Sequence, residues 1–460
     1  MTAQKAVYVT GAAYDPIWKI VLSRASQTTR GYDQTRIYKI QETEEEDNFI
    51  TEVLLDNSDS AFDGIDFEQY QGIIYTGYNT GVARSAWAAN TAYSVGDIRV
   101  PTTVNGYQYR CTIAGTSHAT TEPTWGTALG VTQTDGSVTW EMDGNTGDEY
   151  SPVSPMRVTA QEFLSSETQL TCRLYLIGIP NDMRQDLAES AYTLESTDTQ
   201  TAKTLLTAIA APTLTPYTNY AAYTATYDSE DSIIDSFKPA DYFRVDINEN
   251  RDDKIQELLN YTRCKRRPEA DGELHILVPK TTSKTWAAAT AYVANDYVQP
   301  TTPNNNFTYK CTTAGTSHAA TEPTWPTTAG GTVTDGATLV WTAMDFDYEY
   351  RLAVDTYHTF FSKALRQRFV NPNKEIVTSP STHSPAYSGN ATSATSYGLR
   401  KKIRTTQRRL ASNAQGTAIS AAMIERDELE AERGSIVVPM NPGQEIWDWI
   451  KAIDSRENGD

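Results

Sequence analysis

The residues best suited to metal or redox chemistry are few and scattered along this chain. Four cysteines form no Cys-x-x-Cys pair and lie near no histidine at metal-ligand spacing: Cys111, Cys172, Cys264 and Cys311. Zinc sites and disulfide frameworks need closer spacing, so we expect buried free thiols. His118 and His318 occupy identical Gly-Thr-Ser-His-Ala segments, where a lone histidine is an ordinary loop residue. The sequence therefore predicts no metal site and no cofactor.

Catalytic motifs give no stronger signal. The sequence has no Gly-x-Ser-x-Gly elbow, no His-Glu-x-x-His, no Walker-type phosphate loop and no Cys/His catalytic arrangement. Glycan hydrolases use two carboxylates, and among 58 acidic residues such a pair can always be imagined. The run Glu44-Glu45-Glu46-Asp47 is typical of a solvated surface. We expect no catalytic residues and a protein that is not an enzyme.

Aromatic residues instead recur in a segment that occurs twice. Residues 87–142 and 286–344 are the two copies; from Trp87/Trp286 to Trp140/Trp341 they align with two single-residue insertions, so that the offset grows from 199 to 201. Tight-turn dipeptides separate the short apolar runs of these copies: Asn105-Gly106, Asp135-Gly136 and Asp335-Gly336. Each copy is therefore predicted to be a small all-β module of three or four strands, with most of its aromatic residues in the core.

The first copy carries the pattern W…AY..GD..V…Y.C…GTS…EPTW…DG..TW. This pattern resembles the small carbohydrate-binding modules appended to chitinases and cellulases, and similar modules inserted in virus tail proteins. The resemblance implies that an exposed aromatic ring stacks on a sugar. Trp125 and Trp325, each after a Pro-Thr loop, are the candidates for that ring, with Tyr109 and Tyr309 as further carbohydrate-binding candidates. Alternatively, the tryptophans close the module cores and the modules are spacers.

The two copies differ at a turn, where Asn295 of the second replaces Gly96 of the first.

Length and charge limit what the whole chain can be. At 460 residues it is long enough for several domains, and its net charge of −19 opposes any sequence-independent grip on nucleic acid. No stretch of 18 apolar residues and no hydrophobic leader is present, so we expect a soluble protein without a standard export signal.

The chain around the two modules reads continuously, which is typical of insertion at loop tips. We expect a first tube-like β-domain of residues 1–85 and 144–180 split by module 86–143, a helical and helix-hairpin domain of residues 181–285, module 286–344, and a second tube-like domain of residues 345–460. The predicted fold class is multidomain, mainly β with some α (α+β), with split β-barrel tube domains.

Local patterns predict the elements of these domains. Strands are expected over residues 48–55, 71–78, 273–279, 348–355 and 435–440, and a hairpin over residues 156–163 and 170–178. Helices are expected over residues 182–192, 199–211 and 414–432, and over residues 250–262, where Asp252 and Asp253 fall in the first turn. Residues 212–227 are predicted to be an ordered linker and residues 370–398 a long loop. The basic cluster of Lys401, Lys402, Arg404, Arg408 and Arg409 favours a salt-bridged contact between subunits over a nucleic-acid patch.

Two segments of this host chain carry a second resemblance. Residues 248–279, NENRDDKIQELLNYTRCKRRPEADGELHILVP, resemble the helix and hairpin of virus tail hubs and related secretion-system spikes. Residues 418–460, AISAAMIERDELEAERGSIVVPMNPGQEIWDWIKAIDSRENGD, resemble the final part of tail-hub proteins, where a helix precedes a β-hairpin of a tube domain. The chain is thus similar to tailed-bacteriophage baseplate or tail-tip hub proteins over most of residues 45–460 outside the modules.

The hub resemblance implies a homotrimer whose subunits each supply two tube domains around a central channel. It implies location at the distal end of the virion tail and, as partners, a tail tube or distal tail protein, the tape measure protein and tip or fibre proteins. DNA would be only a transient passenger in the channel, and the modules would face outward, toward host-surface polysaccharide. Two alternatives stay open: a glycan-binding adhesin without a tube role, and a glycan-degrading enzyme carrying carbohydrate-binding modules.

Overall fold

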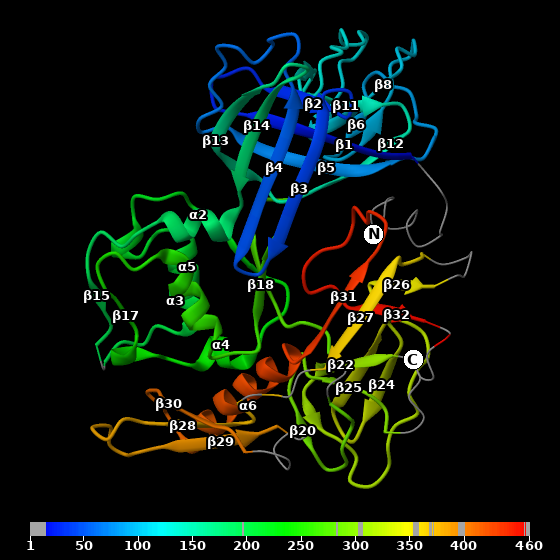
Figure 1. Cartoon of the computed structure of the whole chain (residues 1–460). Coiled ribbons are helices and arrows are strands. Elements are labelled where there is room, and N and C mark those ends of the chain that lie inside the picture. Colours follow the sequence, from blue (N-terminus) through cyan, green and yellow to red (C-terminus); the bar gives the residue numbers. More distant parts are fainter. Residues whose placement is uncertain are drawn as a thin grey trace.

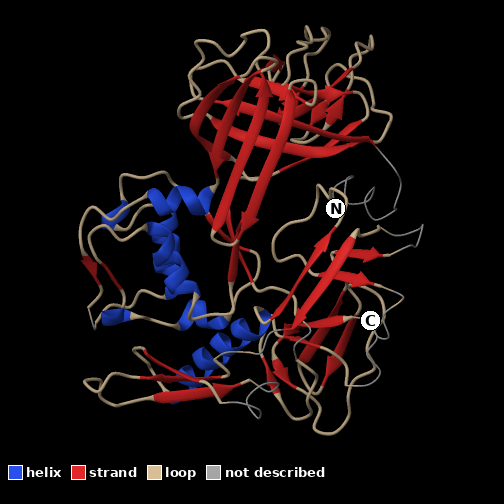
Figure 2. Cartoon of the chain, in the orientation of Figure 1, coloured by secondary structure: helices blue, strands red, loops and turns tan. Residues whose placement is uncertain are grey.

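The chain is a multidomain, mainly β protein in which the few helices gather in one region (Figures 1 and 2). The computed structural model describes residues 15–195, 197–281, 284–301, 307–352, 358–367, 370, 372–393, 401–454 and 456. The predicted mainly-β fold class is confirmed. Among the described residues, no helix has the length and apolar character needed to cross a membrane.

The amino-terminal region is one curved eight-stranded sheet of order β2-β1-β5-β13-β14-β4-β3, with β12 also paired to β5. Its strands are β1 Asp15–Ser23, β2 Arg30–Asp33, β3 Ile37–Glu45, β4 Asn48–Asp56, β5 Gln71–Asn79, β12 Asp148–Pro152, β13 Met156–Ser165 and β14 Leu170–Ile177. Alternate residues face one core, as in β4, where Phe49, Val53 and Leu55 are fully buried. The predicted strands and the β13–β14 hairpin are confirmed. The expected barrel is not: the described pairings leave β2 and β3 as the two ends of an open sheet.

The first module occupies the connection between two paired host strands. β5 ends at Asn79 and β12 begins at Asp148, and these two residues are opposite one another in the register of the β5–β12 pair. The module contains a four-stranded sheet of order β10-β11-β8-β7 and a small β6–β9 pair. Its strands are β6 Ala92–Tyr93, β7 Ile98–Arg99, β8 Tyr107–Ile113, β9 Gly115–Thr116, β10 Thr132–Asp135 and β11 Val138–Asn145.

The second module repeats this topology, with sheet order β21-β22-β25-β24 and a β20–β23 pair. Its strands are β20 Ala291–Tyr292, β21 Tyr297–Val298, β22 Thr308–Thr313, β23 Gly315–Thr316, β24 Thr332–Asp335 and β25 Leu339–Met344. In both copies the Asp-Gly turn places its glycine at positive φ, at Gly136 and Gly336. The predicted small all-β modules are therefore present, but each has a separate two-stranded pair in addition to the three or four strands expected.

A helical region follows the amino-terminal sheet and contains the largest apolar core of the chain. Its helices are α2 Ile179–Gln185, α3 Ala202–Ala210, α4 Ser232–Ser236, α5 Arg251–Leu259, η1 Thr215–Tyr217 and η2 Ala240–Tyr242. Its strands are β15 Tyr192–Thr193, β16 Ala225–Tyr227, β17 Arg244–Val245, β18 Lys265–Pro268 and β19 Leu274–Leu277. The α5 helix and the β18–β19 hairpin agree with the prediction, and Asn250 caps α5 by accepting from the Asp253 amide at 2.8 Å.

The helix predicted over residues 182–192 was wrong in both bounds. Pro180 lies in the first turn of α2, which therefore starts at Ile179, and Asp186 is extended after the helix ends. Leu187 then forms a β-bridge with Asn250, so backbone pairing with the segment before α5 replaces further helix. The expected linker over residues 212–227 is ordered, since Tyr217 is fully buried and β16 joins β19 in parallel.

The carboxy-terminal region combines three small sheets with the longest helix. Its elements are β26 Tyr348–Arg351, β27 Ser362–Gln367, β28 Lys374–Thr378, β29 Ser388–Thr392, β30 Ile403–Gln407, α6 Asn413–Leu429, β31 Glu432–Val437 and β32 Ile450–Ile453. The α6 helix matches its prediction. The expected strand over residues 348–355 is observed to Arg351, and residues 353–357 lie outside the described part.

Two expectations for this region were wrong. Residues 370–398 are not a plain loop, because β28 and β29 form a hairpin there and β30 adds to β28 in parallel; residues 371 and 394–398 lie outside the described part. This sheet packs on α6 so closely that a side chain at Gly389 would collide with the α6 backbone. The expected terminal hairpin is also not formed: β31 pairs with β27, and β32 pairs in parallel with β26. Phe346, stacked on Trp449 at 3.8 Å, holds the chain before β32 beside β26.

Candidate functional site

The core of the first module is organised by one buried carboxylate. Asp135 is 3 % exposed, and its Oδ2 accepts hydrogen bonds from the indole nitrogens of Trp87 (2.7 Å) and Trp140 (3.1 Å). Its Oδ1 accepts from the backbone amide of His118 at 2.8 Å. A buried carboxylate needs hydrogen-bond donors, and because two of these donors are indole N–H groups, the arrangement fixes both indole rings in one orientation. Trp87 and Trp140 are therefore structural residues.

The second module repeats this arrangement in every contact. Asp335 accepts from the Trp286 indole at 2.7 Å, the Trp341 indole at 3.1 Å and the His318 amide at 2.7 Å. In both copies the histidine ring is a local turn residue, since Nδ1 of His118 accepts from the Thr121 amide at 2.9 Å. The two modules thus share one fold and the same hydrogen bonds around this carboxylate.

Trp125, the residue predicted to stack on a sugar, lies half-buried at the edge of this core. One side of its ring packs on Tyr109, with centroids 4.3 Å apart, and its indole nitrogen donates to Glu122 at 2.8 Å. Glu122 is itself held by the Thr102 amide at 2.8 Å. Burial opposes the charge of Glu122, but the bonds from Thr102 and Trp125 outweigh it and hold its pKa below the ordinary value. The ring is therefore held in a fixed orientation before any ligand arrives.

Trp325 is held in the same way in the second module. Its ring packs on Tyr309 at 4.2 Å, and its indole nitrogen donates to Glu322 at 2.8 Å. Tyr109 and Tyr309 are both fully buried, and their hydroxyls donate inward to the carbonyls of Gly126 and Pro326. These tyrosines support the tryptophan rings from below and present no face of their own to a sugar. Trp125 and Trp325 keep partly exposed rings.

The two tryptophans have different neighbours. Beside Trp125, Gln133 accepts a hydrogen bond from the Gly126 amide at 2.8 Å, and its Nε2 has no hydrogen-bond partner among the described residues. In the second module Pro326 and Val333 occupy the equivalent positions, and Val333 packs against the core. The first copy thus has an amide beside its ring, whereas the second is apolar there.

The first module is attached to the amino-terminal sheet through buried charges. Lys19 of β1 is fully buried and donates to Asp143 Oδ1 at 2.9 Å, while its ammonium lies 4.1 Å from the Tyr150 ring centroid. Burial favours neutral Asp143, but Lys19 and Arg110 outweigh it and hold the pKa of Asp143 below its ordinary value. A second pair, Arg84–Glu149, spans the two connecting segments at 3.3 Å.

The second module is attached to the helical region by a different set of residues. Tyr297 of β21 is part of the large apolar core, and Met344 packs against the same core. Arg263 forms ion pairs with Asp231 at 3.2 Å and with Asp296 of the module. Asn295 has the positive φ of Gly96 and in addition donates to the Glu230 carbonyl at 2.7 Å. The residue that distinguishes the copies at this turn is therefore a docking contact.

The remaining motifs of the sequence are placed as follows. All four cysteines are free and buried, as predicted. In the acidic run, Glu46 accepts from Lys265 at 3.1 Å, so part of the run contacts the helical region. In the basic cluster, Arg404 pairs within the chain with Glu375 (2.6 Å) and Asp427 (3.1 Å). Arg404 is therefore engaged in an intrachain ion pair.

One further cluster surrounds His275 of β19. Its Nδ1 lies 3.0 Å from Asp228 and 3.6 Å from Glu269, and its Nε2 lies 3.0 Å from Asp271. Asp228, Glu269 and His275 offer three potential ligand atoms within 4.8 Å of one another, the type of set that can hold a cation. The same geometry satisfies a protonated imidazole. Sequence reasoning missed this cluster because two of its carboxylates follow β16 and β18, and the sheet pairing brings them to β19.

Sequence reasoning also missed Glu122, Glu322, Asp135 and Asp335. All four are repeated between the two copies, at fixed distances from a tryptophan or in the Asp-Gly turn. Because these four residues are identical in the two copies, a comparison of the copies could have identified them as structurally important. The contacts of Lys19 and Arg263 could not be found in this way, because each residue belongs to the host chain and contacts a module at another place in the sequence.

Neither the protein-family models nor the curated proteins compared with the chain match it. Two solved structures are similar over 95 % of this chain: a tail protein from Neisseria meningitidis MC58 (8 % identity, 87 % of that chain, TM-score 0.43) and the 43 kDa tail protein of prophage MuSo2 from Shewanella oneidensis (10 % identity, 89 % of that chain, TM-score 0.40). These identities and TM-scores are too low to establish a family or a function, so the proposals below rest on the chain's own residues.

Proposed function

We propose that the chain is a structural subunit of a virus tail, which assembles with copies of itself into a trimeric hub at the distal end of the tail and carries out no chemical turnover. The observation that carries this proposal is the incomplete β-structure of the carboxy-terminal region. β26–β32 and β27–β31 are separate two-stranded sheets (Figure 1). Within the described residues, neither gains a third strand beyond an isolated bridge between Tyr350 and His358.

Two-stranded sheets are marginally stable in water unless they pack on something larger. Among the described residues, the apolar cluster around these strands has three buried members, Tyr348, Tyr350 and Phe360, and its other members are only partly buried. Joining strands from neighbouring subunits would complete the sheets, enlarge this core and satisfy the edge N–H and C=O groups. Closed rotational symmetry would then give a ring with a channel.

The resemblance of residues 248–279 and 418–460 to tail hubs supplies the identity of the partners. They are a tail tube or distal tail protein, the tape measure protein and tip or fibre proteins, with DNA as a passenger in the channel. A net charge of −19 favours passage of DNA over retention. The modules, attached at separate points of the host chain, would face away from the channel.

Native mass spectrometry of the full chain, followed by cryo-electron microscopy of purified virions, tests this proposal. We expect trimers in solution or on the particle, with three copies around the channel and both modules on the outside. A chain that is absent from the virion would overturn it. A chain found only in peripheral fibres would favour the adhesin alternative.

Glycan binding by the modules is a second candidate function, favoured by the orientation of Trp125 and Trp325. Each ring has a partly exposed face and is fixed by a glutamate and a buried tyrosine, which lowers the entropy lost on stacking. A panel of polysaccharides can be tested for retention of the full chain on affinity gels. We expect Trp125→Ala and Trp325→Ala to reduce retention, and Val95→Ala, a change at a residue 66 % exposed in the first module, to leave it unchanged. Equal retention of all variants would contradict glycan binding at these rings.

A further inference from the structure

The ring of His275 lies between two carboxylates in the helical region. It is on β19, is 7 % exposed, and has its Nδ1 3.0 Å from Asp228 and its Nε2 3.0 Å from Asp271. Asp228 follows β16 and Asp271 lies between β18 and β19, so the two strands that flank β19 each bring one carboxylate to the ring. An ionised carboxylate only accepts hydrogen bonds, whereas a neutral imidazole has a single N–H. Both contacts are therefore satisfied only by a protonated ring.

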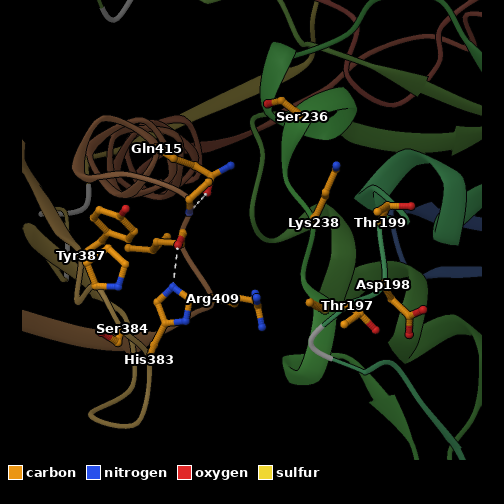
Figure 3. Close-up of a pocket in the computed structure, with 14 residues that line it drawn as sticks. Thr197, Asp198, Thr199, Ser236, Lys238, His383, Ser384, Tyr387, Arg409 and Gln415 are labelled. Atoms are coloured by element: carbon orange, nitrogen blue, oxygen red, sulfur yellow. Dashed lines mark hydrogen bonds between the residues drawn. The ribbon is translucent and has the colours of Figure 1, made fainter.

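His383, in the polar cleft of Figure 3, is a contrasting case in the same chain. Its Nε2 lies 3.1 Å from the carbonyl oxygen of Leu410, which is an uncharged acceptor. Its ring lies beside Tyr387, with centroids 6.1 Å apart. A neutral imidazole satisfies the contact with Leu410 through its one N–H. The two carboxylates thus distinguish His275 from a histidine whose contact requires no charge.

A metal ion is not needed to explain this cluster. The oxygen of Glu269 that lies 3.6 Å from Nδ1 of His275 is Oε1, and the same oxygen accepts from Arg267 Nη2 at 2.6 Å and Nε at 2.7 Å. A divalent ion between Nδ1 and Oε1 would lie beside the guanidinium and be repelled by it. A ring proton brings a single positive charge, and Asp228 and Asp271 already bond to both N–H groups. The geometry therefore favours a proton over a metal ion.

Arg267 connects the cluster to the carboxy-terminal region. It lies opposite His275 in the register of the β18–β19 pair, and Glu269 contacts both side chains. Its Nη2 also lies 3.1 Å from Glu445, and its Nη1 donates to the Ile446 carbonyl at 3.3 Å. These two residues belong to the segment 441–449, which leads into β32. The charge on the His275 ring is thus one residue away from the contacts that hold this segment.

Acidic side chains from every element around the ring outnumber the cations there. These carboxylates belong to Asp228 after β16, to Glu269, Asp271 and Glu273 between β18 and β19, to Glu445 and Asp448 of the segment 441–449, and to Glu42 and Glu44 of β3. Among the described residues, the cations of this group are Arg267 and the His275 ring. Lys265, farther along β18, pairs with Glu46 and Glu430 instead. Loss of the ring proton therefore increases an existing excess of negative charge.

The pKa shifts of this group act in one direction. Burial lowers the pKa of His275, but the bonds to Asp228 and Asp271 outweigh burial and raise it above the ordinary value. Its contribution to stability is present below its unfolded-state pKa and is lost as pH rises through its folded-state pKa. Burial raises the pKa of Glu44 to about 8 and also raises the pKa of Glu445. Ionisation of these two acids costs stability as well, so rising pH weakens the junction through all three groups.

From this geometry we propose that His275 is a proton switch at the junction between the helical region and the carboxy-terminal region. With the ring protonated, Asp228 and Asp271 are held on either side of β19, and Glu269 and Arg267 fasten the segment 441–449. Loss of the proton makes one of the two ring contacts repulsive and loosens this segment. The switch acts through contacts within one chain, so it is independent of trimer formation and of glycan binding.

A histidine NMR titration of the full chain gives the first test. The chain has five histidines, and His275→Gln identifies the resonance of His275. We expect that resonance to titrate above the ordinary histidine pKa of about 6.5. Titration at or below that value would overturn the proposal. The titration is repeated with zinc chloride, where we expect no change. Zinc binding that abolishes the titration of His275 would assign the cluster to a metal ion and rule out the proton switch.

Hydrogen exchange from about pH 5.5 to about pH 9, corrected for the intrinsic rate, gives the second test. We expect residues 441–453 of the unmodified chain to exchange about tenfold faster above the titration of His275 than below it, and β8 and β11 of the first module to stay unchanged. Exchange at 441–453 that ignores this titration would refute the switch. This measurement needs no variant, so it decides the matter even if a variant fails to fold.

A pair of matched variants then assigns the response to one residue. His275→Gln places a neutral side chain between the two carboxylates, so residues 441–453 should exchange fast already at low pH and lose most of the response. The control His383→Gln should respond like the unmodified chain. A response of full size in His275→Gln, shown to be folded by circular dichroism, would assign it to a buried acid such as Glu44 and remove the role of His275.

Discussion

The two modules are copies of one fold that are attached to the host chain by opposite means. Internally they share the same carboxylate–indole arrangement around Asp135 and Asp335. At the attachment face, Asp143 of the first module pairs with buried Lys19, whereas Met344, at the corresponding end of β25 in the second module, packs against an apolar core. The residue types inside a module are therefore determined by the fold of the module, whereas the residue types at its attachment face are determined by the surface on which it docks.

The largest expected effect is on the buried pair of the first module. Lys19→Met leaves Asp143 charged, buried and without its lysine, so we expect a loss of about 3–5 kcal/mol in the free energy of unfolding. The double variant Lys19→Met/Asp143→Met imitates the second module and should recover most of this loss. Urea unfolding, with hydrogen exchange to locate the affected strands, measures both. A double variant no better than the single one would contradict the comparison.

The second largest effect is expected from changing the buried carboxylate inside each module. Asp135→Asn and Asp335→Asn keep the shape but place an amide donor among indole donors, which leaves buried groups unpaired and should cost about 1–3 kcal/mol in each copy. Urea unfolding of the two variants in parallel measures the costs, and each is the control for the other. A cost in one copy several times larger than the cost in the other would show that they are not internally equivalent.

A smaller effect is expected at the turn where the copies differ. Asn295→Gly removes the hydrogen bond to the Glu230 carbonyl but relieves a positive φ, so the net loss should be about 1 kcal/mol or less. The reciprocal Gly96→Asn meets open space and has no docking partner, and should not stabilise the first module. Thermal unfolding of both variants measures the contrast. A stabilised Gly96→Asn would mean that the asparagine acts within the turn and not across the interface.

The smallest expected effect is a pH response at Trp125. Hydrogen bonds from Thr102 and Trp125 depress the pKa of Glu122 in the folded protein. The contribution of Glu122 to stability is therefore present above its unfolded-state pKa and is lost as pH falls through its folded-state pKa. The indole N–H resonance of Trp125, identified with Trp125→Phe, should shift as Glu122 is protonated. Glu122→Gln should abolish that shift and leave the Trp325 resonance unchanged. A shift that survives Glu122→Gln would assign the response to another group.

The parts of the fold that were predicted from sequence are those set by local patterns. The alternation of apolar and polar residues predicted β4 and β5, and capping residues together with the helical spacing of apolar residues predicted α5 and α6. The terminal hairpin was wrong because β31 and β32 find partners in β27 and β26, 60 or more residues away, and local turn residues at 441–443 carry no information about that choice. Likewise, the aromatic candidates were found from the repeat, but the burial of Tyr109 followed only from its place beneath Trp125.

The register pair Asn79–Asp148 has a mechanical consequence. A pull on the first module would load β5 and β12 at their shared end, and their hydrogen bonds would then open one after another, which requires little force at each step. The contacts of Lys19 with Asp143 and of Arg84 with Glu149 lie beside that end and bear the load together. A module that is pulled away from the chain would thus transmit tension to the amino-terminal sheet through these charges before any strand peels away.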